Sequence, residues 1–163
     1  MNTPAAIDLS PPTLDAAGIA ARIPHQGAMC LLQRLQQWSA THIHCTADSH
    51  RDPANPLRDE VGLASVNAIE YASQAMALHG SLNAAPGTAP VPGFLASVRG
   101  VKLAVERLDS VSGALQVHAE KLAGDTRQAM YQFHIDDEQG QRLVQGRATV
   151  VLNPMPLQQV GPR

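Results

Sequence analysis

Residues Leu63 to Leu82, LASVNAIEYASQAMALHGSL, constrain the fold of this chain more than any other part of its sequence. Its residues are small or apolar almost all round, which is typical of a helix wrapped by other structure. From Val61 through Val98 the only Asp, Glu, Lys or Arg is Glu70. A carboxylate inside such a helix needs a partner or a raised pKa, because burying an ionised group is costly. Glu70 is therefore a candidate general acid or base, and the alternative is a helix-edge carboxylate that reaches solvent or caps a loop.

Composition narrows the class of protein. The chain has 163 residues, of which 44% are hydrophobic, and this is enough for one domain with a real core. Its net charge of −2, without a Lys/Arg cluster, argues against nucleic acid and anionic membranes as partners. No apolar run approaches a membrane span and the N-terminus lacks a signal peptide pattern, so we expect a cytoplasmic protein. Cys30 and Cys45 lack metal-ligand spacing and are expected as buried free thiols, and we expect no metal and no cofactor.

The chain divides into one domain with two tails. Residues 1–12 are Pro-rich and predict a flexible N-terminal arm, residues 13–153 form the domain, and residues 154–163 form a C-terminal tail. Thr13 or Asp15 is placed to cap a short helix that ends at Ala21.

Extended patterns flank the long helix. Before it, Met29 to Leu35 suits a strand, and THIHCTAD at residues 41–48 alternates as its antiparallel partner. After it come four further extended stretches, at residues 94–108, 114–122, 128–136 and 142–152. Their connections SVSG, AGDT and DEQG have the composition of hairpin turns. The pattern predicts an α+β fold, with an antiparallel sheet of about five to six strands around one long central helix.

Five histidines are interpreted by their place on the predicted strands or helix. His42 and His44 fall on one face of a strand, which we interpret as a solvated face rather than as metal ligands. His118 and His134 lie on outer strands, and His79 is predicted to end the helix facing solvent.

The order of these elements is that of the hotdog fold, and the chain resembles FabZ-type beta-hydroxyacyl-(acyl carrier protein) dehydratases. The resemblance is carried by IPHQGAMCLLQRL, AIEYASQAMA and PGFLASVRGVKLAVERLDSVSGALQV, and extends from about Ile23 to Leu152. Together PHQGAMCLL, HRDPANPLR, the helix and GRATVVL are similar to the ApeP-like branch, which is tied to aryl-polyene or xanthomonadin-type pigment clusters.

This resemblance implies removal of water from a 3-hydroxyacyl thioester, at a site shared between two subunits. A helix carboxylate and a loop histidine suit this chemistry, because one abstracts the proton alpha to the carbonyl and the other protonates the departing hydroxyl. Glu70 matches the family carboxylate. Gln74 matches the glutamine of the family helix motif and shares a face with Glu70, so it could orient the carboxylate or a water. Ser65 falls where the family helix opens and is expected as its N-cap. The resemblance implies Gln74, Ser65 and Phe94 as the substrate-binding residues.

Two histidines compete for the second role. His50, in HRDPANPLR, resembles the family histidine, but its loop to Glu70 is longer than in that family and Leu63-Ala64-Ser65 replaces a Met-Pro-Gly. His25, in PHQGAM, matches a family segment at a turn near the helix. Each could instead be a loop histidine bonded to backbone.

Three functions stay open at this point. The first is a 3-hydroxyacyl-ACP dehydratase whose partner is acyl carrier protein. The second is a hotdog thioesterase that uses Glu70 to activate water, and the third is a half-site subunit that supplies Glu70 to another dehydratase chain. A single sheet around one helix leaves an edge open, so a homodimer is the default and a heterodimer the alternative. The acyl channel is then expected along the interface, lined by residues such as Phe94.

Overall fold

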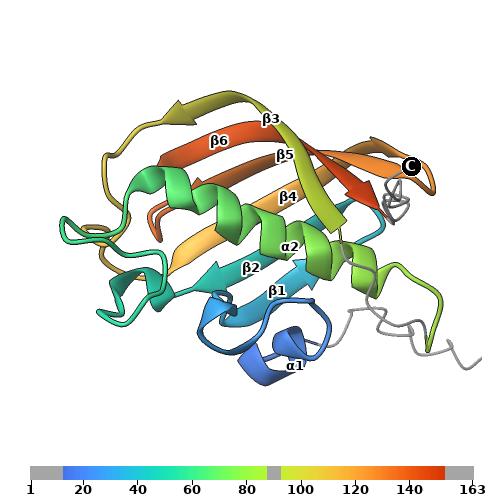
Figure 1. Cartoon of the computed structure of the whole chain (residues 1–163), viewed down its shortest axis with the longest axis horizontal. Coiled ribbons are helices and arrows are strands. Elements are labelled where there is room, and N and C mark those ends of the chain that lie inside the picture. Colours follow the sequence, from blue (N-terminus) through green and yellow to red (C-terminus); the bar gives the residue numbers. More distant parts are fainter. Residues whose placement is uncertain (1–12, 88–92, 153–163) are drawn as a thin grey trace, which may run out of the picture.

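The computed structural model describes residues 13–87 and 93–152, so the predicted N-terminal arm and C-terminal tail lie outside the described residues. These residues form two helices, six strands and three short 3-10 turns. Figure 1 shows how the helices and strands are arranged. In chain order they are α1 (Ala16–Ala20), η1 (Gly27–Met29), β1 (Arg34–Trp38), β2 (His42–Ala47), η2 (Ser49–Arg51), η3 (Ser65–Asn67), α2 (Ala68–Leu82), β3 (Gly93–Leu103), β4 (Leu115–Gly124), β5 (Gln128–Asp136) and β6 (Arg142–Leu152).

The six strands form one antiparallel sheet in the order β1-β2-β4-β5-β6-β3. Helix α2 lies across one face of this sheet, which curls around it (Figure 1). The strand that follows the helix, β3, takes the far edge beside β6. The predicted arrangement of one long helix wrapped by an antiparallel sheet is confirmed.

The core lies between α2 and the sheet. Strands β4 and β5 alternate buried and partly exposed residues, as the period of a half-buried strand requires. Small buried residues on α2, such as Ala68, Ala72 and Ala75, leave room for large ones from the helix and the sheet, such as Tyr71 and Phe133. Both the sheet side of α2 and much of its outer side are covered by other residues. This burial explains why the helix is apolar on most of its circumference.

The first strand begins later than the sequence predicted. The run from Met29 to Leu35 looked like a strand, but β1 begins at Arg34 and residues 27–29 form η1. The reason is a long-range contact: the side-chain amide of Gln74 bonds both Leu31 N and Met29 O, which a strand would offer to a neighbouring strand. By contrast, the cap of α1 is as predicted, since the Asp15 carboxylate accepts from Gly18 N at 2.9 Å.

The two edges of the sheet differ. At β1, Leu35 N donates to Leu14 O at 2.8 Å, so the segment before α1 covers that edge. At β3, large apolar side chains are exposed, with Phe94 at 56%, Leu95 at 41% and Leu103 at 47%. The β3 edge is thus the open one of the two.

His79 contradicts its prediction. It lies near the end of α2, but it is buried rather than facing solvent. Its Nδ1 contacts Tyr131 Oη at 2.8 Å and its Nε2 contacts Ser39 O at 2.9 Å. Burial lowers the pKa of His79, so the neutral ring serves as a polar tie between α2, β5 and the β1–β2 turn.

None of the helices in residues 13–87 and 93–152 is long and apolar enough to cross a membrane.

Candidate active site

Glu70 lies in the first turn of α2, and its side chain is 31% exposed. Its Oε1 is 3.1 Å from Nε2 of His25, whose side chain is 23% exposed. The structure thus brings together a carboxylate and an imidazole that are 45 residues apart in the sequence. Both remain partly open to solvent, which is what a proton-transfer pair requires in order to meet a substrate.

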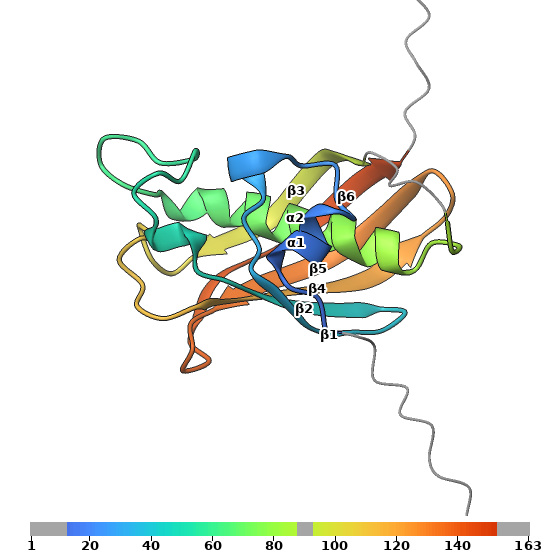
Figure 2. The same ribbon diagram turned by 90° about the horizontal axis from the view of Figure 1, so that it is seen from below.

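The turn that carries His25 is built by a glycine. Gly27 has a φ of 58°, in the left-handed region that side chains with a Cβ disfavour, and it begins η1 directly after Gln26. Cys30 Sγ then donates to the His25 carbonyl at 3.3 Å and closes the turn. In Figure 2 the blue segment that contains η1 lies beside the green helix α2.

Gln74 joins this turn to the helix. Its Nε2 donates to Met29 O at 2.6 Å and to Glu70 Oε1 at 3.1 Å, while its Oε1 accepts from Leu31 N at 2.9 Å. Both acceptors face the NH₂ group and the donor faces the oxygen, so the chemistry of the partners fixes the orientation of the amide. The buried side chain of Gln74 therefore sets the position of both the carboxylate and the segment that presents His25. The predicted i,i+4 pair of Glu70 and Gln74 is present.

Electrostatics keep Glu70 ionised. The hydrogen bond from His25 lowers the pKa of Glu70 below its usual value, burial acts in the opposite direction, and the bond from Gln74 lowers it further. The position in the first helical turn also favours a negative charge, because the helix dipole is positive there. The pairing, not desolvation, decides the state of this carboxylate, which suits it to accept a proton.

Two polar atoms of the pair make no hydrogen bond among the described residues. Its Nδ1 is buried and makes no hydrogen bond within the described part of the chain. Among the same residues no hydrogen bond reaches Oε2 of Glu70 either, because the bonds from Gln74 and His25 both end on Oε1. Oε2 of Glu70 is therefore the carboxylate oxygen that is available to accept a substrate proton.

His50 is placed differently. It lies in η2, is fully buried, and its Nε2 contacts Val111 O at 3.0 Å. Burial lowers the pKa of His50, and no ion pair or hydrogen bond within residues 13–87 and 93–152 connects it to Glu70. Of the two rival histidines, the structure brings His25 to the carboxylate and gives His50 a backbone partner.

The loop after His50 is held in place by hydrogen bonds to the rest of the domain. Asn55 Nδ2 donates to Ser49 O and to Tyr71 Oη, at 2.9 and 3.1 Å. At the other end Asp109 accepts from Leu63 N at 2.9 Å. These contacts anchor the long loop to the body of the domain.

Ser65 corrects the predicted helix cap. It begins η3, three residues ahead of α2, and the N-cap residue of α2 is Asn67, which makes no side-chain capping bond. Ser65 is buried and its backbone N donates to Glu106 O at 2.9 Å. A 3-10 turn thus replaces the expected serine cap.

Beside this turn the surface is hollowed. A hollow of about 380 Å³ is lined by Ala64, Ser65, Val66 and residues 103–106. Val66 is 51% exposed and lies one turn before Glu70. Phe94, which we expected in a substrate channel, lies on β3 and is exposed in the single chain. The hollow is open to solvent beside the start of α2, and Phe94 is exposed along the open β3 edge.

Comparison with known families decides the class. A profile of the ApeP-like family, described as ApeP dehydratase, matches residues 17–160. The chain belongs to this family. Its reaction class is dehydration, so it is a hydro-lyase, and the family match covers both Glu70 and His25.

Solved structures support the fold of this ApeP-like chain. The dehydratase heterocomplex ApeI:P from Xenorhabdus doucetiae is 23% identical, with a TM-score of 0.71 over 84% of this chain and 91% of that chain. A variant of a thioesterase from Pseudomonas aeruginosa is 12% identical, with a TM-score of 0.53 over 73% of this chain and 79% of that one. A variant of a Staphylococcus aureus thioesterase is 13% identical, with a TM-score of 0.55 over 74% and 92%. The hotdog prediction is confirmed.

No curated protein matches the chain.

Proposed function

We propose that this ApeP-like protein dehydrates a 3-hydroxyacyl thioester carried on acyl carrier protein to the trans-2-enoyl thioester, with Glu70 and His25 as the proton-transfer pair. The observation that carries the proposal is the 3.1 Å contact between Glu70 Oε1 and His25 Nε2 in a partly exposed position. The family match supports the reaction class. The setting that we propose is cytoplasmic fatty-acid-like or aryl-polyene pigment synthesis.

The proton movements balance within the pair. Glu70, held ionised, takes the proton from the carbon alpha to the thioester carbonyl, and an enolate forms. The bond between the beta carbon and the hydroxyl oxygen then breaks, and the oxygen leaves as water with a proton from protonated His25. The proton on Glu70 passes to His25 across their contact, which restores both groups.

Gln74 acts as a positioning residue in this scheme. Its two N–H groups are committed to Glu70 and to Met29 O, so it fixes the carboxylate relative to the segment that presents His25. A shift of about 1 Å between two such groups costs on the order of a hundredfold in rate. The buried amide keeps the pair in register without touching the substrate.

A second hotdog subunit is proposed to complete the site. The β3 edge is unprotected in the single chain and carries Phe94, Leu95 and Leu103 exposed, while the β1 edge is covered by the chain itself. Pairing along β3 would bury these side chains, and Phe94 would then line the acyl channel. We propose a homodimer, and assembly with a different dehydratase subunit is the other outcome of the test, in keeping with the heterocomplex of ApeI:P.

Acyl carrier protein is the proposed macromolecular partner. Arg51 and Arg99 are exposed and suit the acidic surface and pantetheine phosphate of such a carrier. Arg58 is partly engaged, since its Nη2 lies 3.5 Å from Asp109 Oδ2.

The experiment is mass spectrometry of a 3-hydroxyacyl-ACP incubated with the purified full chain. The expected product has lost one water, and native mass spectrometry of the same sample reports whether the chain is a homodimer. Release of the free acid would replace the proposal with a thioesterase. Activity that appears only after addition of a second dehydratase subunit would replace the homodimer with a heterodimer.

A further inference from the structure

The outer face of the sheet carries a row of imidazoles that the reaction does not use. His42 and His44 lie on β2, His118 on β4 and His134 on β5, while the residues on either side of His44, His118 and His134 point into the core and are buried. His44 is opposite His118, and His118 is opposite His134, across the antiparallel register. Helix α2 covers the other face, so this row and the Glu70 pair stand on opposite sides of the sheet.

The rings are stacked. The centroids of His44 and His118 are 4.1 Å apart with an interplanar angle of 10°, and those of His118 and His134 are 4.6 Å apart at 15°. His42 joins the row through its Nε2, which is 3.3 Å from His118 Nδ1. Four imidazoles packed in this way gather their ring nitrogens over three adjacent strands, β2, β4 and β5.

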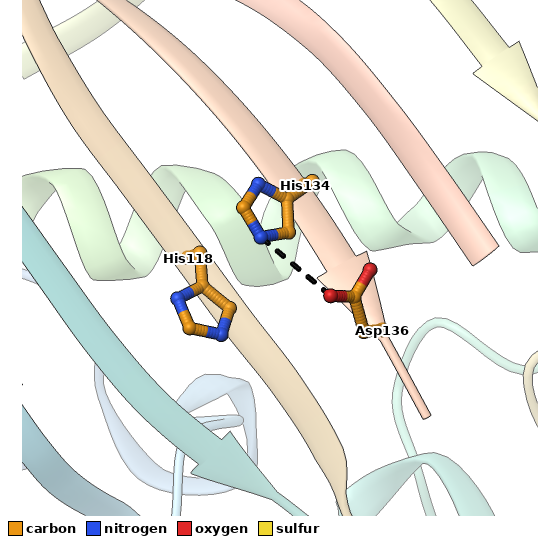
Figure 3. Close-up of side chains that lie close together, drawn as sticks. All are labelled: His118, His134 and Asp136. Carbon is orange, nitrogen blue, oxygen red and sulfur yellow. Dashed lines mark ion pairs between the residues drawn. The ribbon is translucent and has the colours of Figure 1, made fainter. Parts of the chain in front are cut away.

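A carboxylate closes the group. Asp136 follows His134 by two residues on β5 and therefore faces the same side. Its Oδ2 lies 3.6 Å from His134 Nε2, and Figure 3 shows His118, His134 and Asp136 in front of the strands with α2 behind. One ligand atom from each of the three lies within 4.8 Å of the other two.

We propose that His118, His134 and Asp136 bind a divalent transition metal ion, with Zn²⁺ as the best fit. Imidazole nitrogen with one carboxylate oxygen is a donor set that suits Zn²⁺, whereas Mg²⁺ and Ca²⁺ prefer oxygen alone. A tetrahedral zinc ion holds its ligand atoms roughly 3.3 Å apart, given metal–ligand bonds near 2.0–2.1 Å. Binding would require rotations of these partly exposed side chains that bring the three atoms to that spacing, with water in the fourth position.

The surroundings favour ligands that are free of protons. Burial and then the neighbouring imidazoles lower the pKa of His118 to about 4, and burial with nearby Arg142 lowers that of His134. Both rings are therefore neutral near pH 7, which is the form that binds metal.

Arg142 brings a positive charge beside Asp136 at this site. Its Nε donates to Asp136 Oδ1 at 2.6 Å, which orients the carboxylate and leaves Oδ2 towards the histidines. A ligating carboxylate that is itself hydrogen-bonded is usual in metal sites. The ion would tie β4 to β5 and would not alter the dehydration chemistry on the far face.

The test is calorimetric titration of ZnCl₂ into the full-length chain without an affinity tag, near pH 7 in a non-coordinating buffer. We expect one saturable site per chain and a rise in Tm with zinc. His134→Gln and Asp136→Asn should each weaken binding by about tenfold or more, since each removes a ligand without adding bulk. His25→Gln removes a histidine on the other face and should bind zinc as the parent does.

Two outcomes would overturn the site. One is a parent chain without saturable binding, and the other is a His134→Gln or Asp136→Asn chain that folds normally and binds zinc as tightly as the parent. Circular dichroism and Tm without zinc check folding in each variant. Dehydration by His134→Gln should stay within about twofold of the parent, so failure of the metal site is separable from failure of the proposed active site.

Discussion

His25 and His50 are both loop histidines that precede helix α2, yet the structure gives them opposite surroundings. His25 is partly exposed and contacts a carboxylate, whereas His50 is fully buried and contacts a backbone carbonyl. The carboxylate beside His25 can exchange a proton with the ring, whereas the carbonyl beside His50 cannot. Motif likeness alone therefore does not assign a catalytic histidine, because the partner atom decides what the ring can do.

The largest effect is expected at the partner that distinguishes the two histidines. Glu70→Gln keeps the size of the side chain and removes the proton acceptor, and it also weakens the contact to His25. We expect dehydration to fall by about 10⁴-fold, the upper end for loss of a general base. Turnover of a 3-hydroxyacyl-ACP followed by mass spectrometry measures the loss, with Tm as the folding control. Near-normal turnover by the folded variant would contradict the assigned role of Glu70.

The two histidines are next compared directly. His25→Gln should lower kcat by about 10²-fold with little change in Tm, because an amide can still bond Glu70 but cannot deliver the proton. His50→Gln is the matched control, since it removes a buried ring bonded to Val111 O. This variant should retain kcat and melt at a lower temperature, with Tm reduced by about 2–4 °C for each kcal/mol of lost stability.

The reverse pattern would exchange the two assignments. A folded His50→Gln chain without activity, beside an active His25→Gln chain, would make His50 the proton donor. Initial rates and thermal melts of both variants in one buffer settle the comparison.

Local pattern predicted the helix and one of its pairs. The apolar run with a single charge gave the buried helix, and the i,i+4 spacing placed Gln74 beside Glu70, because both features depend only on helical period. Strands β2, β4, β5 and β6 followed from alternation in the same way.

Contacts between segments that are distant in the sequence could not be predicted from local pattern. The burial of His79 depends on Tyr131, on a strand that the sequence reaches only 52 residues later. The late start of β1 depends on the amide of Gln74, and the choice between His25 and His50 depends on which loop crosses the helix. The sequence placed His118 and His134 on outer strands, and this was wrong, because their strands β4 and β5 are the two central strands of the sheet. The register that stacks these rings on each other and on His44 is a property of the whole sheet.

A smaller effect is expected at the residue that holds His25 near Glu70. Gln74→Met removes the amide with little change in volume, and kcat should fall by about tenfold. Because the bond from Gln74 lowers the pKa of Glu70, its loss should also raise the pH at which activity falls on the acid side. The pH profile of kcat separates this role from general destabilisation, which would leave the profile in place.

Gln74→Glu provides the second variant for this prediction. It keeps an acceptor for Leu31 N but sets a carboxyl beside Glu70, so the acid limb should move to higher pH still. An unchanged limb in both folded variants would remove Gln74 from the control of the carboxylate.

The smallest expected effect is on stability and pH. The pKa of Glu70 in the folded chain is below its ordinary value of 4.5, with the bond from His25 as the main cause. The ionised group therefore stabilises the fold above that ordinary value, and the contribution is lost as the pH falls through the lowered pKa. The difference in unfolding free energy between the parent and Glu70→Gln, measured in urea, should be constant near neutrality and shrink on acidification. It should be small, because a side chain that is 31% exposed is screened by water. A difference that grew on acidification would mean that burial outweighs the hydrogen bond and that the carboxyl is held protonated, which would make Glu70 the acid and His25 the base.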